Sequence, residues 1–409
     1  MYRFVTLALL IGVRIADAED DAPREVAFEP GKGLRVGSAD GEFELDVRAR
    51  IQARAELEHT DKPELTAQIR RLRLVLQGHS FGKRNRFYIQ LGFSPRDQLG
   101  ALAVEDGSIR RTPLRDARIE VERHRDLTIV VGQTKVPFSR QRLISSGSLE
   151  LPDRAITNEE FNLDRDLGVI VRSDNLGGFG GMLGYAAGVF TGRARNAFEA
   201  QPVDLLYVAR LDLRPTGAFD DLEEADLGRT KQPRLGLGLA YAFQDDAIAD
   251  RGGYGELFPD GGTTDYHHVT ADAMFKWRGF SAQLAVHLRH GANRRGGDLR
   301  DETGELILPP PARSGVGGLV QLGYVFPGRP LQLVTRYAFV RNPYDEDSAL
   351  WWRDEAGVGI GWYFRKHGYK LQADYLRQFG RDTGPAGASY LDALHGGSDL
   401  VRVQLQLVL

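Results

Sequence analysis

The stretch FELDVRARIQARAE at residues 43–56 alternates apolar and polar side chains without a break. Phe43, Leu45 and Val47 would lie on one face, and Glu44 and Asp46 on the other. Successive side chains of a β-strand point to opposite faces, so a period of two gives one apolar and one polar side. A helix with this pattern would have no coherent face. The stretch therefore predicts a strand with water on one side and apolar surroundings on the other.

The same alternation recurs along the whole chain. Most of these runs are longer than the ~5–6 residues of an average soluble strand. They match the ~9–11 residues that a tilted strand needs to cross a bilayer. Sixteen runs are predicted as strands: 42–57, 66–79, 84–94, 113–123, 126–134, 166–174, 178–191, 203–214, 233–243, 265–277, 280–290, 315–326, 329–341, 354–365, 367–379 and 397–409.

The links between the runs alternate in length. Every second link is long, as at 135–165 and 291–314, whereas most of the others are tight turns, such as 124–125 and 327–328. Outer-membrane barrels combine short periplasmic turns with long external loops in this way. The link 215–232 breaks the rule, because a short turn is expected there. We interpret it as an enlarged periplasmic loop.

Aromatic residues occur where the membrane boundaries would lie. They flank tight turns at one end of the strands and close a strand at the other end, in the manner of interfacial girdles. These residues are Trp277, Phe280, Tyr324, Phe326, Trp362 and Phe364, with Tyr241 and Phe243 at the opposite end. An even strand count lets a barrel close and lose its edges. We predict an all-β fold, a 16-stranded antiparallel transmembrane β-barrel with both termini periplasmic. A soluble secreted β-protein that binds a ligand is the alternative.

Composition and the N-terminus indicate the compartment. The 409 residues contain 53 Lys and Arg against 56 Asp and Glu and no Cys, so the net charge is -3. This near-neutral balance argues against nucleic acid as a partner. Residues 1–18 have a ten-residue apolar core and an Ala-Asp-Ala cleavage site, which predict a signal peptide. We expect an N-terminal periplasmic segment at 19–41 and an outer-membrane porin barrel at 42–409.

In each predicted strand, the polar residues that alternate with the apolar ones would line the lumen. Among the charged ones, basic residues are more frequent than acidic residues. Fifteen inward Lys and Arg face eleven inward Asp and Glu when the run ends are left out. Basic rings favour anions and phosphate. The other interpretation is that these arginines pair with nearby acids and brace the wall. The expected lumen-lining residues include Arg48, Arg50, Arg54, Asp116, Arg118 and Arg336.

The third long link, 135–165, is the expected constriction, folded into the barrel. It carries three bases before its first acid, Glu150, and a loop of this kind would place cations opposite the wall. The bases are Lys135, Arg140 and Arg142, and the hydroxyl donors include Ser139, Ser145 and Ser146. An external loop with solvated charges is the alternative. On the second run, Arg71 and Arg73 are two apart and share the inward face. With Lys135 and Arg140 they form our predicted anion site.

Catalytic patterns are missing from the sequence. It contains no G-x-S-x-G, H-E-x-x-H or P-loop string. His267 and His268 are adjacent, so in a strand they face opposite ways and cannot share a metal. We therefore expect a protein that is not an enzyme and that needs no cofactor.

Several segments together resemble the phosphate-selective porin O and P family. They begin with GKGLRVGSADGEFELDVRARIQAR, IRRLRLVLQG, VVGQTKVPFSRQRLISSGSLELPDR and RDLGVIV, and end with WYFRKHGYKLQADY and VRVQLQLVL. The resemblance implies a trimeric porin with an infolded third loop and an arginine-lined path for phosphate or polyphosphate. It marks Arg70 and Arg71 as paired constriction arginines. Lys135 and the pair Ser145 and Ser146 lie in the matching loop. Periodicity turns Arg70 away from the lumen unless a bulge intervenes.

Together these observations predict passive diffusion of small anions, plausibly phosphate, across the outer membrane of a Gram-negative (didermal) bacterium. The expected partners are small anions, outer-membrane lipid and two further copies in a homotrimer. Two alternatives stay open. One is a nonspecific or cation-leaning general porin, because inward acids could dominate locally. The other is an occluded barrel with an enzymatic or adhesive role.

Overall fold

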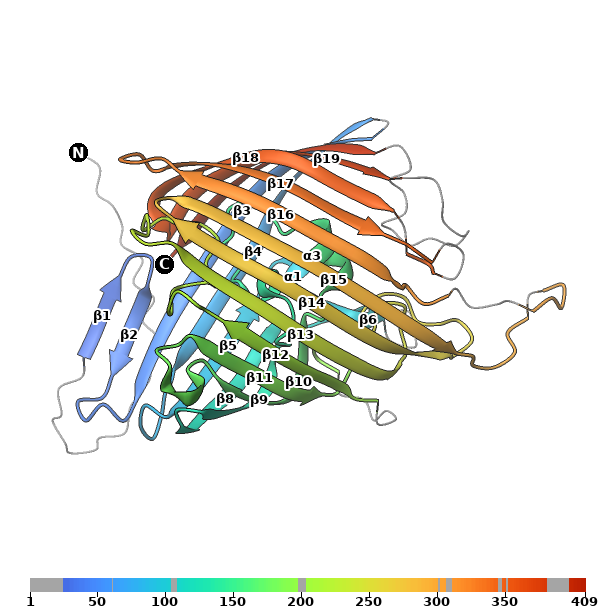
Figure 1. Ribbon diagram of the computed structural model, residues 1–409, viewed down its shortest axis with the longest axis horizontal. Coiled ribbons are helices and arrows are strands. Elements are labelled where there is room, and N and C mark those ends of the chain that lie inside the picture. Colours follow the sequence, from blue (N-terminus) through green and yellow to red (C-terminus); the bar gives the residue numbers. More distant parts are fainter. Residues whose placement is uncertain are drawn as a thin grey trace, which may run out of the picture.

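A closed antiparallel barrel makes up most of the computed structural model (Figure 1). The structure describes residues 25–60, 62–103, 109–197, 204–300, 302–306, 311–344, 348–350, 352–380 and 397–409. The predicted signal peptide and most of the eighth external link lie outside these residues. The barrel strands are β3 (Glu44–His59), β4 (Pro63–His79), β5 (Asn85–Gly92), β8 (Leu114–His124), β9 (Leu127–Lys135), β10 (Arg165–Ser173), β11 (Leu183–Phe190), β12 (Leu206–Leu213), β13 (Arg234–Ala247), β14 (Thr263–Trp277), β15 (Phe280–Arg294), β16 (Gly315–Val325), β17 (Leu331–Arg341), β18 (Arg353–His367), β19 (Tyr369–Gly380) and β20 (Ser398–Val408).

Each barrel strand pairs with its neighbour along the chain, and the last strand returns to the first. β20 pairs with β3 from Asp399↔His59 to Val408↔Arg50. Each of the sixteen described barrel strands therefore has a neighbour on both sides, as a membrane-spanning sheet requires. All sixteen predicted strands are present, with shifted ends. The largest shift is at β11, which begins five residues late because the glycine-rich turn before it contains the short 3-10 helix η1 (Leu176–Gly178).

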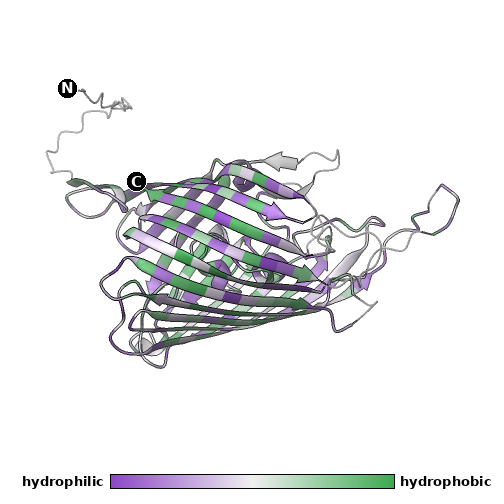
Figure 2. Cartoon of the chain, turned by 90° about the horizontal axis from the view of Figure 1, so that it is seen from above, coloured by the Kyte–Doolittle hydropathy of each residue, from purple (hydrophilic) through white to green (hydrophobic). Residues whose placement is uncertain are grey.

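The two faces of the barrel wall separate as the alternation predicts. On β20, the outward Leu405 is 42% exposed, whereas its inward neighbours Gln404 and Gln406 are almost fully buried. Figure 2 shows the apolar and polar residues alternating along the strands. Rings that we expected near the membrane boundaries also lie partly exposed, among them Trp277, Tyr324, Trp362, Phe364 and Tyr241. The wall is therefore built for lipid outside and polar groups inside.

The alternation did not predict one hairpin of the structure. This hairpin continues the barrel wall alongside β3, past the point where the C-terminal strand β20 ends. It consists of β1 (Glu25–Glu29) and β2 (Gly33–Gly37), within the segment 19–41. β2 pairs with β3 from Leu34↔Val47 to Gly37↔Glu44, and β20 covers the rest of β3. The turn places Gly31 and Gly33 at positive φ, where glycine is favoured. The hairpin therefore covers the part of β3 that β20 does not reach.

The third loop folds into the barrel, as predicted. It connects β9 to β10 and contains the short helices α2 (Arg140–Leu143) and α3 (Ile156–Phe161). Ile156 and Phe161 of α3 pack against inward residues of β15, β16 and β17, among them Ala285 and Leu319. Phe138 packs in a second cluster with residues of β9, β10, β12 and β13. The loop is thus attached to the wall on both sides of the lumen.

We interpreted the link 215–232 as an enlarged periplasmic loop. The structure corrects this interpretation, because the link folds into the interior of the barrel. Its Asp221, Glu224 and Asp226 are almost fully buried. The backbone amide of Glu224 donates to the Ser148 carbonyl at 3.2 Å, and the Glu150 amide donates to the Glu224 carboxylate at 2.8 Å. The third loop therefore supplies partners for Asp221 and Glu224, whereas Asp226 accepts from Thr230 and from the Gly279 amide. Length and charge alone could not indicate these contacts.

The second external link also carries local structure. It contains α1 (Pro95–Gln98) and a small sheet of β6 (Leu99–Ala103) and β7 (Ile109–Arg111). The carboxylate of Asp97 in α1 points to the second barrel strand. None of the helices in the described part of the chain is long and apolar enough to cross a membrane.

Candidate functional site

A cavity of about 960 Å³ runs beside the third loop. Its lining comes mainly from the strands β3 to β5, β8 to β12 and β18 to β20 and from the loop itself. It reaches from Thr60 and Glu64 near the first external link to Asp174 and Gly184 near the η1 turn. Seventeen basic and twelve acidic residues line it. Basic residues therefore outnumber acidic residues along this space.

Two serines of the third loop lie against arginines of the wall. The guanidinium of Arg50 donates to Ser145 Oγ at 3.1 Å and to Ser146 Oγ at 2.9 Å. Arg73 donates to Ser146 Oγ at 3.0 Å. Gly147 makes this approach possible, because a Cβ there would lie 2.2 Å from Arg50 Nη1. The loop and the first two barrel strands therefore meet at Ser145 and Ser146.

Two further cations bind carbonyl groups of the same loop segment. Lys135 Nζ donates to the Leu143 carbonyl at 2.6 Å and to the Ile144 carbonyl at 3.3 Å. Arg154 also donates to the Ile144 carbonyl, at 2.6 Å. We call Arg50, Lys135 and Arg154 the cation cluster. Within the described ranges, none of the three forms an ion pair with a carboxylate. Burial lowers the pKa of Arg154 to about 10, so it stays charged at neutral pH.

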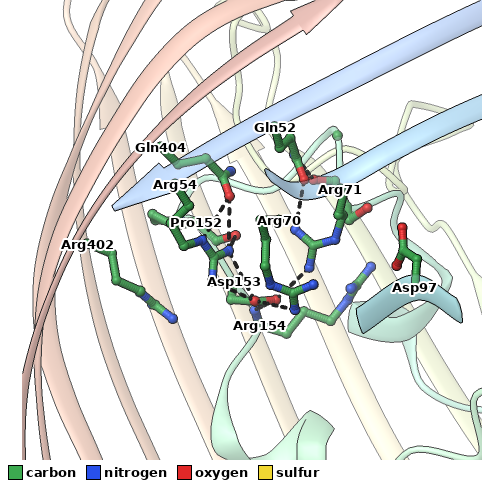
Figure 3. A network of polar contacts seen from close by, with 12 residues as sticks. Gln52, Arg54, Arg70, Arg71, Asp97, Pro152, Asp153, Arg154, Arg402 and Gln404 are labelled. Atoms are coloured by element: carbon green, nitrogen blue, oxygen red, sulfur yellow. Dashed lines mark hydrogen bonds and ion pairs between the residues drawn. The ribbon is translucent and has the colours of Figure 1, made fainter. Parts of the chain in front are cut away.

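Arg70 and Arg71 both point into the barrel because β4 contains a bulge. Gln52 pairs with Arg71 whereas Ala53 pairs with Ile69, so Arg70 is an extra residue that the partner strand does not match. A bulge of this kind redirects a side chain. Both guanidinium groups reach Asp153 of the third loop at 2.9 Å (Figure 3). The structure thus supplies the local irregularity that the family resemblance required.

Arg54 completes the contacts of Asp153. Its Nη1 and Nη2 both lie 3.1 Å from Asp153 Oδ2, and its Nη2 donates to the Pro152 carbonyl at 2.7 Å. Burial favours the neutral acid, but the nearby Arg70, Arg71 and Arg54 outweigh it and hold the pKa of Asp153 well below its usual range. The carboxylate is therefore ionised. We call Arg54, Arg70 and Arg71 the arginine triad.

Arg73 has an acid partner as well as a serine. It makes a two-pronged ion pair with Asp97 of α1, at 2.7 Å for both nitrogen–oxygen distances. Arg115 approaches the same carboxylate at 3.2 Å. Arg73 is therefore positioned beside Ser146 with most of its charge already balanced.

The remaining predicted residues of the loop lie elsewhere. Arg140 is surrounded by three carboxylates, at 3.0 Å from Asp212 and 2.8 Å from Asp272, with Asp221 also bonded. Arg142 pairs with Asp164. The Ser139 hydroxyl is buried without a hydrogen-bond partner among the described residues. The structure therefore brings Arg71, Arg73 and Lys135 toward one segment of the loop but places Arg140 in an acidic pocket of the wall.

The expected lumen-lining residues also differ in their surroundings. Arg54, Asp116 and Arg118 line the cavity. Arg118 stacks over the Tyr88 ring at 4.3 Å, and Asp116 pairs with Arg165. Arg336 is buried and donates to Gln321 at 2.9 Å and to the Asp153 carbonyl at 2.8 Å. Arg48 and Arg50 are half-buried and do not line the cavity itself.

Three important residues escaped the sequence argument. Asp97 and Asp153 contact predicted site residues, and Arg154 donates to the Ile144 carbonyl that Lys135 also contacts, but none of the three was singled out. Asp153 and Arg154 stand in the segment SLELPDR, which already carried the family resemblance. A charged pair directly after a proline in the expected constriction was the available signal. In the described part of the chain, no group of His, Asp and Glu residues is placed to hold a metal ion.

The closed sixteen-stranded barrel, its apolar outer face and its charged interior have the architecture of outer-membrane porins. Residues 40–197 match the model of the family named phosphate-selective porin O and P, which confirms the resemblance drawn from the motifs. No curated protein matches the chain.

Several solved porins share the fold. The anion-selective porin of Comamonas acidovorans is 13% identical, with a TM-score of 0.54, over 90% of this chain and 100% of that one. OmpF of Salmonella typhi, in complex with daunomycin, is 11% identical with a TM-score of 0.55, over 90% of this chain and 98% of that one. The channel DcaP of Acinetobacter baumannii is 12% identical with a TM-score of 0.52, over 90% and 98% of the two chains. These likenesses establish the architecture.

Proposed function

We propose that this porin carries small anions, with phosphate or polyphosphate among them, by passive diffusion along the basic cavity. The observation that carries this proposal is the cation cluster, of which Lys135 and Arg154 line the cavity together with Ser145 and Ser146. Charges in such a cluster attract a passing anion because none of the three bases forms an ion pair with a carboxylate of the described residues.

The chemistry of the cluster suits an oxyanion. A guanidinium can give two parallel hydrogen bonds to neighbouring phosphate oxygens, and an ammonium adds a point charge. Arg50 and Lys135 also bond to serine hydroxyls and carbonyls of the loop. An entering phosphate must compete with these neutral acceptors. Binding is therefore weak enough for release, as a conducting site requires.

The proposal includes the surroundings of the barrel. We infer that the chain lies in the outer membrane of a didermal bacterium, with lipid against its apolar face and two further copies in a homotrimer. The trimer rests on the family resemblance. Chemical crosslinking in native outer membranes tests it, since a trimer gives bands at two and three times the mass of the chain.

Reversal potentials across planar bilayers test the proposed function. In a gradient of potassium chloride, an anion-leaning pore gives a reversal potential of the sign set by chloride. A cation-preferring potential would support the general, cation-leaning porin and contradict the proposal. Absence of channel events from correctly folded protein would support the occluded barrel.

A further inference from the structure

The arginine triad has a structural feature that the cation cluster lacks. Arg54, Arg70 and Arg71 converge on one carboxylate, and that carboxylate belongs to the protein itself. Figure 3 shows the three guanidinium groups, from β3 and β4, directed at Asp153 of the third loop. Glu56 also lies 3.4 Å from Arg54 Nη1, so three arginines face two carboxylates and a positive excess of one charge remains.

The geometry is that of a binding site for an oxyanion. Asp153 Oδ2 receives donors from Arg54 and Arg70, and Oδ1 receives a donor from Arg71. Convergent guanidinium donors recognise carboxylate and phosphate oxygens in this manner. Two glutamines of the wall hold two of these arginines in place. Gln52 Oε1 accepts from Arg71 at 2.8 Å, and Gln404 Oε1 accepts from Arg54 at 3.0 Å. The donors therefore stay in place whether or not Asp153 is charged.

The site is also within reach of the solution. The side chain of Asp153 is 20% exposed, and Asp153 lines the same cavity as all three arginines. The buried Nε atoms of Arg70 and Arg71 have no hydrogen-bond partner among the described residues. The triad thus holds donating capacity beyond what one carboxylate uses.

The position of Asp153 is fixed by its own backbone. The carbonyl of Pro152 accepts from Arg54, and the carbonyl of Asp153 accepts from Arg336 at 2.8 Å. The carboxylate is therefore tethered to the triad and does not leave with the ion flow. A passing anion meets a site that is already occupied.

We propose that Arg54, Arg70 and Arg71 form a second oxyanion site, which the third loop keeps filled with the carboxylate of Asp153. This tethered carboxylate sets how weakly the pore holds its ions, because a solute anion can only share or displace its donors. The inference rests on the proposed anion passage and names the residue that regulates it. Without Asp153, the triad would bind a small carboxylate or phosphate strongly enough to slow transport.

The substitution Asp153→Asn tests the proposal, since it removes one charge and keeps the shape. The readout is the phosphate concentration that halves the chloride current of the full-length porin in a planar bilayer. We expect this concentration to fall by about tenfold, as for gaining one charge-assisted contact. Acetate in place of phosphate shows whether the vacated site accepts a carboxylate too. Asp153→Ser removes the same charge if the asparagine variant does not assemble.

Two further variants make the result specific. Adding Arg71→Gln to Asp153→Asn should cancel most of the gain, because the two act on one site. Asp174→Asn is the matched control. It removes one acidic charge from the same cavity, where Asp174 contacts only Arg172 among the described residues, and should change the block by less than about twofold.

The outcomes separate this inference from the proposed function. Suppose that phosphate block is unchanged in both Asp153→Asn and Asp153→Ser while the wild-type pore prefers anions. This result would overturn the second site but would not contradict the proposed anion passage. An equal gain in Asp174→Asn would also overturn it, because the effect would then be one of general charge. A cation-preferring wild-type pore would instead overturn the proposed function.

Discussion

The cation cluster and Arg140 of the third loop have opposite surroundings. Lys135 and Arg154 bind carbonyl groups, and Arg50 meets them from the wall through two serines. Only a few residues away, Arg140 lies among three carboxylates. In the proposed function, the charge of the cation cluster is available to a solute, whereas Arg140 fastens the loop to β12, β14 and the segment 215–232. Charge in a pore therefore acts according to its partners and not according to its place in the sequence.

The comparison predicts that removing Arg140 has the largest effect on stability. Arg140→Gln removes the cation that Asp212, Asp221 and Asp272 share, and breaking a buried ion pair costs about 3–5 kcal/mol. Arg210 and Arg214 stay beside these acids, so we expect a cost at the lower end of that range. We expect a lower melting temperature and a larger, noisier single-channel conductance, because the loop loses this attachment. The heat-dependent gel mobility of the folded barrel measures the first effect.

A conservative variant serves as the control for this experiment. Arg140→Lys keeps the charge but loses the planar fork, so its melting temperature should lie between those of Arg140→Gln and the wild type. If Arg140→Gln has the same melting temperature as the wild type, the acidic pocket around Arg140 does not fasten the loop.

A smaller effect is expected at Glu150, where the third loop meets the segment 215–232. Burial and the neighbouring Glu224 raise the pKa of Glu150, so the folded state favours its neutral form. This contribution to stability is present at acid pH and is lost as pH rises through the raised pKa. Glu150→Gln imitates the neutral acid. It should raise the melting temperature by a few degrees at neutral pH and flatten its pH dependence.

Thermal unfolding at a series of pH values checks this prediction. The contribution of Asp153 to stability changes with pH in the opposite direction. Because its pKa is depressed, the stability that it adds is lost only in strong acid. A wild-type melting temperature that rose steadily from mildly acidic to alkaline pH would contradict the assignment at Glu150.

The smallest effect is expected at the rim. Arg294 pairs with Asp246 at 3.0 Å and with Asp265, but its side chain is 55% exposed. Exposed ion pairs contribute little and are screened by salt. Arg294→Gln should leave both melting temperature and conductance unchanged. A loss of stability like that of Arg140→Gln would show that burial does not separate the two kinds of arginine.

Much of the fold could be predicted because a barrel strand is a local pattern. Alternation such as that of residues 43–56 contains both the strand and the side that faces lipid. Shorter signals were missed. β1 and β2 are only five residues each, and the bulge at Arg70 alters one residue within a regular run. Periodicity detects neither of these, because both depend on pairing with β3.

The candidate site was only partly predictable, for a physical reason. Its bases could be found in the third loop, but their acid partners come from distant strands. Asp272 is 132 residues from Arg140 in the chain, and Arg71 meets Asp153 across 82 residues. Such pairs depend on the register of the whole barrel and on the path of the loop. Sequence therefore located the cations but not which of them would be neutralised.

Phosphate block of the chloride current tests the central claim most directly. The wild-type pore and Lys135→Gln are compared in planar bilayers, with Arg294→Gln as a control that also removes one positive charge. We expect phosphate to block the wild-type and control pores alike, and to need about a tenfold higher concentration in Lys135→Gln, since a charge-assisted bond is lost. Equal block in all three pores, or no block in the wild type, would contradict the cation cluster as the site that holds the passing anion.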